Sequence, residues 1–146
     1  MQPRLDFYTA SPEALKAMLA LEAAVSRLPL EKSLIELVKL RASQINGCAF
    51  CVDMHSVDAL KQGETERRLF AVAVWRESPF FTPRERAALA WTEALTRLAE
   101  TQAPDADYEL LAGQFSPSEC VDLTMAISTI NSWNRLAVGF RKLPQA

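Results

Sequence analysis

Residues 36–55 read Glu36-Leu-Val-Lys-Leu-Arg-Ala-Ser-Gln-Ile-Asn-Gly-Cys48-Ala-Phe-Cys51-Val-Asp-Met-His55, and this stretch predicts two helices separated by a break. Asn46-Gly47 interrupts the first, amphipathic helix and opens the next one. Cys48, Cys51 and His55 follow at spacings of three and four, so they are expected to share one stripe of the second helix. Cys48 would then occupy the first turn, where the positive end of the helix dipole favours a thiolate.

The remaining helices are predicted mainly from proline. Ser11-Pro12, Thr82-Pro83 and Ser116-Pro117 each predict a helix start, because a hydroxyl caps a free N–H and proline fits the first helical position. Glu85 and Glu119 would complete capping boxes. The predicted helices are 12–27, 31–44, 48–62, 64–76, 83–100, 105–114 and 117–137, with ends uncertain by about two to four residues. No segment alternates with period two, so the predicted fold class is all-α, with six to seven helices.

Composition limits the classes of protein and of partner. A chain of 146 residues with 49% hydrophobic content predicts one domain, residues 1–146. Sixteen basic and 18 acidic residues, with no long run of one sign, argue against nucleic acid or a membrane as the main partner. The N-terminus lacks an export signal and no apolar stretch suits a membrane helix, so a cytoplasmic location is expected. Three cysteines do not form a disulfide scaffold.

The helix after the break is apolar on two sides. Val52 and Ala59 extend the cysteine and histidine stripe, which should therefore face protein, where a neutral imidazole could take a thiol proton. Phe50, Met54 and Val57 lie on the opposite side. A helix of this kind requires burial on both faces, and a partner subunit could supply the second cover.

Other interpretations of these residues remain open at this point. His55 could be a packed core residue, and the two cysteines could be inert core fillers. Zinc is the stronger rival, since Cys48, Cys51 and His55 offer three ligands and Glu36 or Asp58 a fourth. No second cysteine or histidine pair completes a structural zinc knuckle, and we expect no metal.

Several other residues have ordinary interpretations. From its spacing alone, Glu36 could pair with a lysine of its own helix at the surface. Cys120 has no partner nearby in the sequence and is predicted to be a small buried residue. The tryptophans are expected to be core or interface anchors; they are Trp75, Trp91 and Trp133.

At these residues the chain resembles the AhpD-like branch of the carboxymuconolactone decarboxylase family. The resemblance lies in a glutamate, eleven residues, and then Cys-x-x-Cys-x-x-x-His, here Glu36, Cys48, Cys51 and His55. It extends to the context Leu40–Cys48 and to the late segment Asn131–Val138, and so covers most of the chain. Typical members carry a second histidine between the cysteines, where this chain has Ala49-Phe50.

The resemblance implies an all-α protein that assembles into trimers or hexamers, with the hexamer favoured, and reduces alkyl hydroperoxides without a cofactor. By similarity, Glu36 and His55 would relay a proton away from Cys51, which attacks the peroxide and becomes a sulfenic acid. Cys48 would protonate the leaving alkoxide or close a Cys48–Cys51 disulfide. An unidentified thiol or dithiol donor would regenerate the pair.

Two further functions stay open. A decarboxylase or lactone-processing enzyme of the same fold needs carboxylate recognition and a proton donor, but it has no need of two thiols. A redox-sensing or zinc-bound module would signal to a partner protein instead of catalysing a reaction.

Overall fold

The computed structural model describes residues 1–144, which form α-helices and one 3-10 helix, with no strand in that range. The α-helices are α1 (Phe7–Ala10), α2 (Pro12–Val25), α3 (Lys32–Ile45), α4 (Ala49–Lys61), α5 (Glu66–Ala71), α6 (Pro83–Thr96), α7 (Leu98–Thr101), α8 (Asp105–Ala112) and α9 (Pro117–Phe140), and the 3-10 helix η1 is Val72–Glu77. The all-α prediction is confirmed for this range, with more helices than expected. Each of these helices is either too short or too polar to cross a bilayer.

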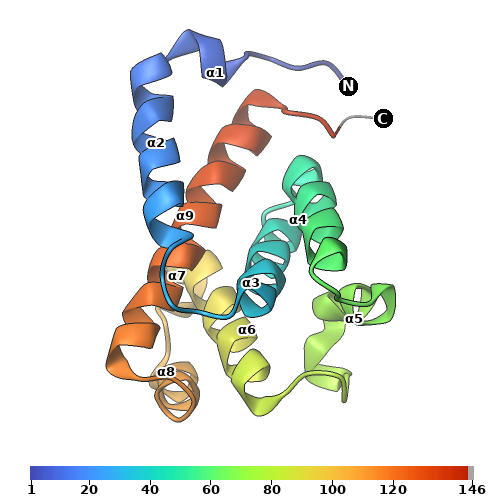
Figure 1. Cartoon of the computed structure of the whole chain (residues 1–146), viewed down its shortest axis with the longest axis vertical. Helices are drawn as coiled ribbons and strands as arrows, with labels where there is room; N and C mark the ends of the chain where they lie inside the picture. Colours follow the sequence, from blue (N-terminus) through green and yellow to red (C-terminus); the bar gives the residue numbers. More distant parts are fainter. Residues whose placement is uncertain (145–146) are drawn as a thin grey trace.

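The centre of the molecule is formed by three helices, α3, α6 and α9. α3 packs against α4, α6 and α9, and α6 packs against α8 and α9. Figure 1 shows α2 beside α9 at one edge of the molecule, and α4 and α5 at the opposite edge. α3 therefore lies between α4, which follows Cys48 and contains Cys51, and α9, which contains the segment Asn131–Val138.

α3 is buried on two faces, and this fixes its rotation. Leu34 and Val38 enter a core shared with α6, α8 and α9. Leu37 and Leu40 enter a second core shared with α4, α5, η1 and α6. With two apolar faces held, the remaining side of α3 directs Glu36 toward α4, where the predicted site lies.

Two of the three proline-led helix starts have the predicted cap. Thr82 and Ser116 each accept the backbone N–H three residues on, and Glu85 and Glu119 reach back to the N-cap backbone, so both capping boxes are formed. Ser11 is different, because its side chain makes no cap hydrogen bond. That serine also ends α1, a helix that the sequence pattern did not predict.

Two predicted helices are each divided in the structure. The segment 64–76 becomes α5 and η1, with non-helical dihedral angles at Val74. Arg86 of α6 donates to the backbone oxygens of Trp75, Arg76 and Ser78 at 3.0–3.1 Å, which satisfies the carbonyls at the end of η1. The segment 83–100 is divided into α6 and α7, and the Thr101 hydroxyl donates to the Ala94 carbonyl at the junction.

Candidate active site

The break before α4 sets the position of the first cysteine. Gly47 has a φ of 66°, a left-handed conformation that glycine adopts without strain. Cys48 is the N-cap of α4 and its Sγ accepts the backbone N–H of Cys51 at 3.3 Å. The prediction that Cys48 lies within the first helical turn was therefore wrong by one residue, because its backbone is extended and its sulfur takes the place of a capping hydroxyl.

The two thiols are buried together and share a hydrogen bond. Cys48 and Cys51 are each 2% exposed. A hydrogen bond from the Cys51 thiol lowers the pKa of Cys48 to about 7, against an ordinary value of 9.0, although burial opposes this shift. The same hydrogen bond, burial and the charge on Cys48 raise the pKa of Cys51. The reduced pair thus holds one proton strongly and releases the other near neutral pH.

Side-chain amides from α9 orient the pair, and the sequence prediction missed them. Asn46 donates through Nδ2 to the Oδ1 atoms of Asn131 and Asn134, at 3.0 and 2.9 Å. This turns the Nδ2 of Asn134 the other way, where it donates to Ser43 Oγ at 3.0 Å. The Asn134 side chain also hydrogen-bonds to both cysteines and lowers the pKa of each.

Asn134 and Ser43 are fully buried polar residues, and the Ser43 hydroxyl in turn donates to the Lys39 carbonyl at 2.7 Å. The only sequence feature that points to this network is that Asn131 and Asn134 interrupt the apolar stripe of α9. That signal does not identify a partner, because 85–91 residues separate the bonded side chains.

His55 and Glu36 lie within hydrogen-bonding distance of each other, as expected of a proton-relay pair. His55 Nδ1 lies 2.8 Å from Glu36 Oε2, and the two side chains are 6% and 12% exposed. Glu36 is thus not a surface residue paired with its own helix. A carboxylate bonded to one ring nitrogen fixes the imidazole orientation and leaves the second nitrogen available for proton transfer.

A mostly apolar cavity of about 320 Å³ borders one of the two sulfurs. Cys51 and His55 line it and Cys48 does not. The other lining residues come from α1, α2, α3, α4, α9 and the segment after α9, and they are Phe7, Tyr8, Leu19, Glu22, Glu36, Lys39, Phe50, Met54, Asp58, Ile130, Trp133, Ala137 and Lys142. Cys51 is therefore the sulfur that a ligand in this cavity can reach.

The outer face of α4 differs partly from the prediction. Met54 and Val57 are 38% and 42% exposed, so they do form an uncovered apolar side. Phe50 does not belong to that side, because its ring packs against the buried cluster of Cys48, Cys51 and Ala137. The reason is its position in the first turn of α4, directly beside the end of α9.

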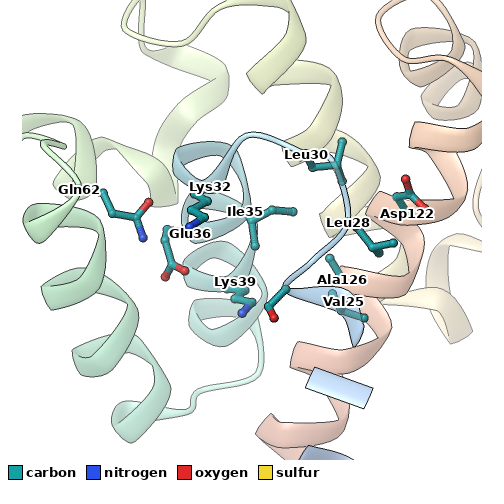
Figure 2. Close-up of a pocket in the computed structure, with 11 residues that line it drawn as sticks. Val25, Leu28, Leu30, Lys32, Ile35, Glu36, Lys39, Gln62, Asp122 and Ala126 are labelled. Carbon is teal, nitrogen blue, oxygen red and sulfur yellow. The ribbon is translucent and has the colours of Figure 1, made fainter. Parts of the chain in front are cut away.

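A second cavity, of about 250 Å³, is also lined by Glu36, but not by His55. Figure 2 shows Glu36 and Lys39 of α3 at its edge, with Gln62 from the end of α4 on one side and Asp122 of α9 on the other. Glu36 lines both cavities. Its carboxylate thus borders both the cysteine cavity and this second, more polar one.

The zinc site with two cysteine ligands is not formed by the described residues. Within 1–144, the side chains that bring three potential ligand atoms within 4.8 Å of one another are Glu36, His55 and Asp58. The cysteines do not join this group; both sulfurs hydrogen-bond to Asn134, and that of Cys51 also to Ser43.

Cys120 and two of the tryptophans are structural, as predicted. Cys120 lies in the core beneath α9, where burial raises the pKa of its thiol. Trp75 is buried, and Trp91 packs against the other core. Trp133 has a different role, since it lines the Cys51 cavity and donates to Glu22 at 3.0 Å.

Comparisons with known proteins identify relatives of the chain and of its fold. The uncharacterized protein YdfG of Bacillus subtilis (strain 168) is 39% identical over 138 residues, which is 94% of each chain. A solved structure from Agrobacterium tumefaciens, ATU0492, is 50% identical with a TM-score of 0.97 over 99% of each chain; it is described as a protein of unknown function and provisionally as the antioxidant defence protein AhpD. The debrominase Bmp8 shares the fold alone, with 20% identity and a TM-score of 0.82 over 92% of this chain and 73% of its own.

The family follows from a match to most of the N-terminal half and centre of the chain. Residues 12–94 match the model of the carboxymuconolactone decarboxylase family, a range that contains all four predicted site residues. Together with the likeness to ATU0492 over nearly the whole chain, this confirms the resemblance on which the site was predicted. The chain belongs to the carboxymuconolactone decarboxylase family, in its AhpD-like branch.

Proposed function

We propose that this protein is a thiol-dependent peroxidase that reduces alkyl hydroperoxides through Cys51 and Cys48, in antioxidant defence. The observation that carries the proposal is a buried, hydrogen-bonded dithiol with one low pKa, of which only Cys51 opens into an apolar cavity. An apolar cavity suits the alkyl part of an organic hydroperoxide, and a thiolate is the nucleophile that attacks its O–O bond.

The hydrogen bond between the thiols supports a division of roles. One proton shift along this bond converts a Cys48 thiolate and a Cys51 thiol into a Cys51 thiolate and a Cys48 thiol. Cys51 Sγ then attacks the terminal peroxide oxygen, the S–O bond forms and the O–O bond breaks. The Cys48 thiol, which is hydrogen-bonded to Cys51, then protonates the leaving alkoxide, and this departs as an alcohol.

The second half of the reaction closes a disulfide. The Cys48 thiolate attacks the sulfur of the Cys51 sulfenic acid, the S–S bond forms and the S–O bond breaks. The departing hydroxide takes up the proton that the dithiol released before the reaction and leaves as water. Two thiols have then lost two electrons to one hydroperoxide, and the products are an alcohol, water and a disulfide. A thiol or dithiol donor, as yet unidentified, restores the pair.

Glu36 and His55 complete the proposal as a proton relay. The fully protonated dithiol must lose one proton before the reaction, and His55 lines the same cavity as Cys51. Because Glu36 holds His55 and also borders the second cavity, the proton has a route away from the sulfurs.

We also propose that the chain works as a homo-oligomer, a trimer or more favourably a hexamer. The support is the uncovered apolar side of α4 and the segment after it. Exposed on these elements are Met54, Val57, Leu60, Phe70 and Val74. Side chains of this size on one region of the surface are typical of an interface.

A decarboxylase or lactone-processing activity is the second candidate, favoured by the name of the matching family and by the Glu36–His55 acid–base pair. Such a reaction requires proton transfer and no thiol. It would therefore survive replacement of both cysteines by serine, whereas the peroxidase reaction would not.

The test is a single turnover of the fully reduced protein with an alkyl hydroperoxide. We expect the wild type to lose two thiols and consume one peroxide per chain, and Cys48→Ser to accumulate a sulfenic acid at Cys51. Cys51→Ser should consume none. The matched control is Cys120→Ser, since Cys120 is buried in a separate core and should leave the reaction unchanged. If peroxide leaves both thiols of the wild type intact, the proposal is wrong.

A further inference from the structure

Almost all charged groups that line the Cys51 cavity have a partner of opposite charge or an imidazole partner. Glu22 binds Lys39 Nζ at 2.7 Å and Glu36 binds His55 at 2.8 Å. Asp58 binds Lys61 at 3.2 Å. The acidic lining residues therefore have cationic or imidazole partners within the described chain, and one of the two lysines, Lys39, is neutralised as well.

Lys142 is the exception among the charged groups of this cavity. Its Nζ lies over three aromatic rings, 4.1 Å from the ring centre of Tyr8, 4.7 Å from that of Phe50 and 5.6 Å from that of Phe7. Within residues 1–144, no carboxylate comes within 4.0 Å of it. The ring faces attract the ammonium but offer it no charged hydrogen-bond acceptor.

The rings hold this ammonium at a defined place in the cavity wall. Phe7 and Tyr8 of α1 stack on each other with ring centres 4.7 Å apart. Phe50 packs on the cysteine cluster and directly precedes Cys51 in the chain. The cavity thus combines a thiol that can reduce a peroxide, an apolar wall, and a cation positioned without an anion.

We infer that the substrate is an amphipathic organic hydroperoxide that carries a carboxylate, as a hydroperoxy fatty acid does, and that Lys142 binds this carboxylate. The inference rests on the proposed peroxidase function and specifies its substrate class. The alkyl chain occupies the apolar part of the cavity and places the hydroperoxide at Cys51. A charge-assisted bond between ammonium and carboxylate then selects the acid over an uncharged hydroperoxide.

A purely structural role is the alternative for Lys142, because it follows the end of α9 and its ammonium lies over aromatic rings of α1 and α4. A structural role would affect all hydroperoxides alike. Recognition of a carboxylate would affect only substrates that have one. The ratio of the two kcat/KM values separates the two roles.

The kinetic experiment compares 8-hydroperoxyoctanoic acid with its methyl ester. We expect the wild type to prefer the acid and Lys142→Met to lower the acid-to-ester ratio of kcat/KM by about tenfold, the usual contribution of one charge-assisted bond. Lys142→Arg keeps the charge and should retain most of the ratio. Lys16→Met, at an exposed position on α2, is the matched control and should leave the ratio unchanged.

A binding experiment keeps the inference testable if no peroxide is reduced. In calorimetric titrations, octanoate should bind the wild type about tenfold more tightly than octanol, and Lys142→Met should remove this difference. A wild type that reduces the ester as well as the acid and binds both probes equally would refute the role of Lys142 while leaving the peroxidase proposal intact. Selective octanoate binding without any peroxide reduction would refute the peroxidase proposal and retain Lys142 as a carboxylate-binding residue.

Discussion

The thiol of Cys51 controls the ionisation of Cys48, and replacing it with alanine tests this directly. The Cys51 hydrogen bond is the largest influence that lowers the Cys48 pKa to about 7 from 9.0. Without this donor, burial still raises the pKa of Cys48, while the Cys51 backbone N–H and Asn134 still lower it, and the pKa should rise toward its ordinary value of 9.0. At pH 7 the thiolate fraction of Cys48 would fall from about one half to about one in a hundred, roughly a fiftyfold loss.

The assay is a pH titration of the ultraviolet absorbance of the thiolate, which requires no reagent to reach the buried sulfur. All proteins would carry Cys120→Ser, so that only the pair contributes to the signal. Cys51→Ser is the matched control, because a serine hydroxyl can donate the same hydrogen bond and should keep the Cys48 pKa low. A titration midpoint that stays near 7 in Cys51→Ala would refute the reasoning and would assign the shift to Asn134 and the N-terminus of α4.

Four further predictions concern stability, assembly and proton transfer. In the folded chain the cysteine pair loses one proton near pH 7 and keeps the other above pH 9, whereas both protons leave near pH 9 in the unfolded chain. The free energy of unfolding should therefore rise between pH 7 and 9 and fall above pH 9. Urea titrations of the wild type, compared with a Cys48→Ser/Cys51→Ser variant, measure this difference. Burial raises the pKa of Glu93, but hydrogen bonds from Trp75, Arg41 and Arg76 outweigh burial, so the net shift of this pKa is downward. Glu93→Gln should therefore lower the free energy of unfolding by about 2–3 kcal/mol at neutral pH. This loss should shrink as the pH falls through the lowered pKa. Val57→Asp places a charge on the proposed interface between subunits and should reduce the mass of the oligomer measured by light scattering. Asp53→Ser, also at an exposed position on α4, should leave this mass unchanged. Glu36→Gln should slow sulfenic acid formation in stopped-flow measurements by about tenfold to a hundredfold without changing the fold, and an unchanged rate would exclude it from the relay.

The parts of the fold that could be predicted from the sequence depend on interactions within a few residues. The capping boxes at Thr82 and Ser116 are closed by residues three positions on, so the pattern contains both partners. The shared inward face of Cys51 and His55 likewise follows from helical periodicity, and Cys48 is buried as well although it precedes the helix as its N-cap.

The parts that could not be predicted depend on residues distant in the sequence. The end of η1 is satisfied by Arg86, whose guanidinium comes from the following helix and leaves no trace in the pattern of residues 64–76. The amide of Asn134 is oriented by Asn46, 88 residues away. Glu36 was identified only through the family resemblance, because its spacing alone equally allows a surface ion pair.

The helix α2, which forms part of the wall of the Cys51 cavity, buries little surface against the rest of the molecule. α2 buries two of its 14 residues, Leu15 and Val25, and Glu22 fastens it by polar contacts to Lys39 and Trp133. An element with so little buried apolar surface opens by local unfolding at a small fraction of the global free energy, and its amide hydrogens exchange accordingly early. The rate at which α2 opens would therefore determine how often the Cys51 sulfur is accessible to molecules too large for the closed cavity. The local stability of this one helix would thus select reactants by size.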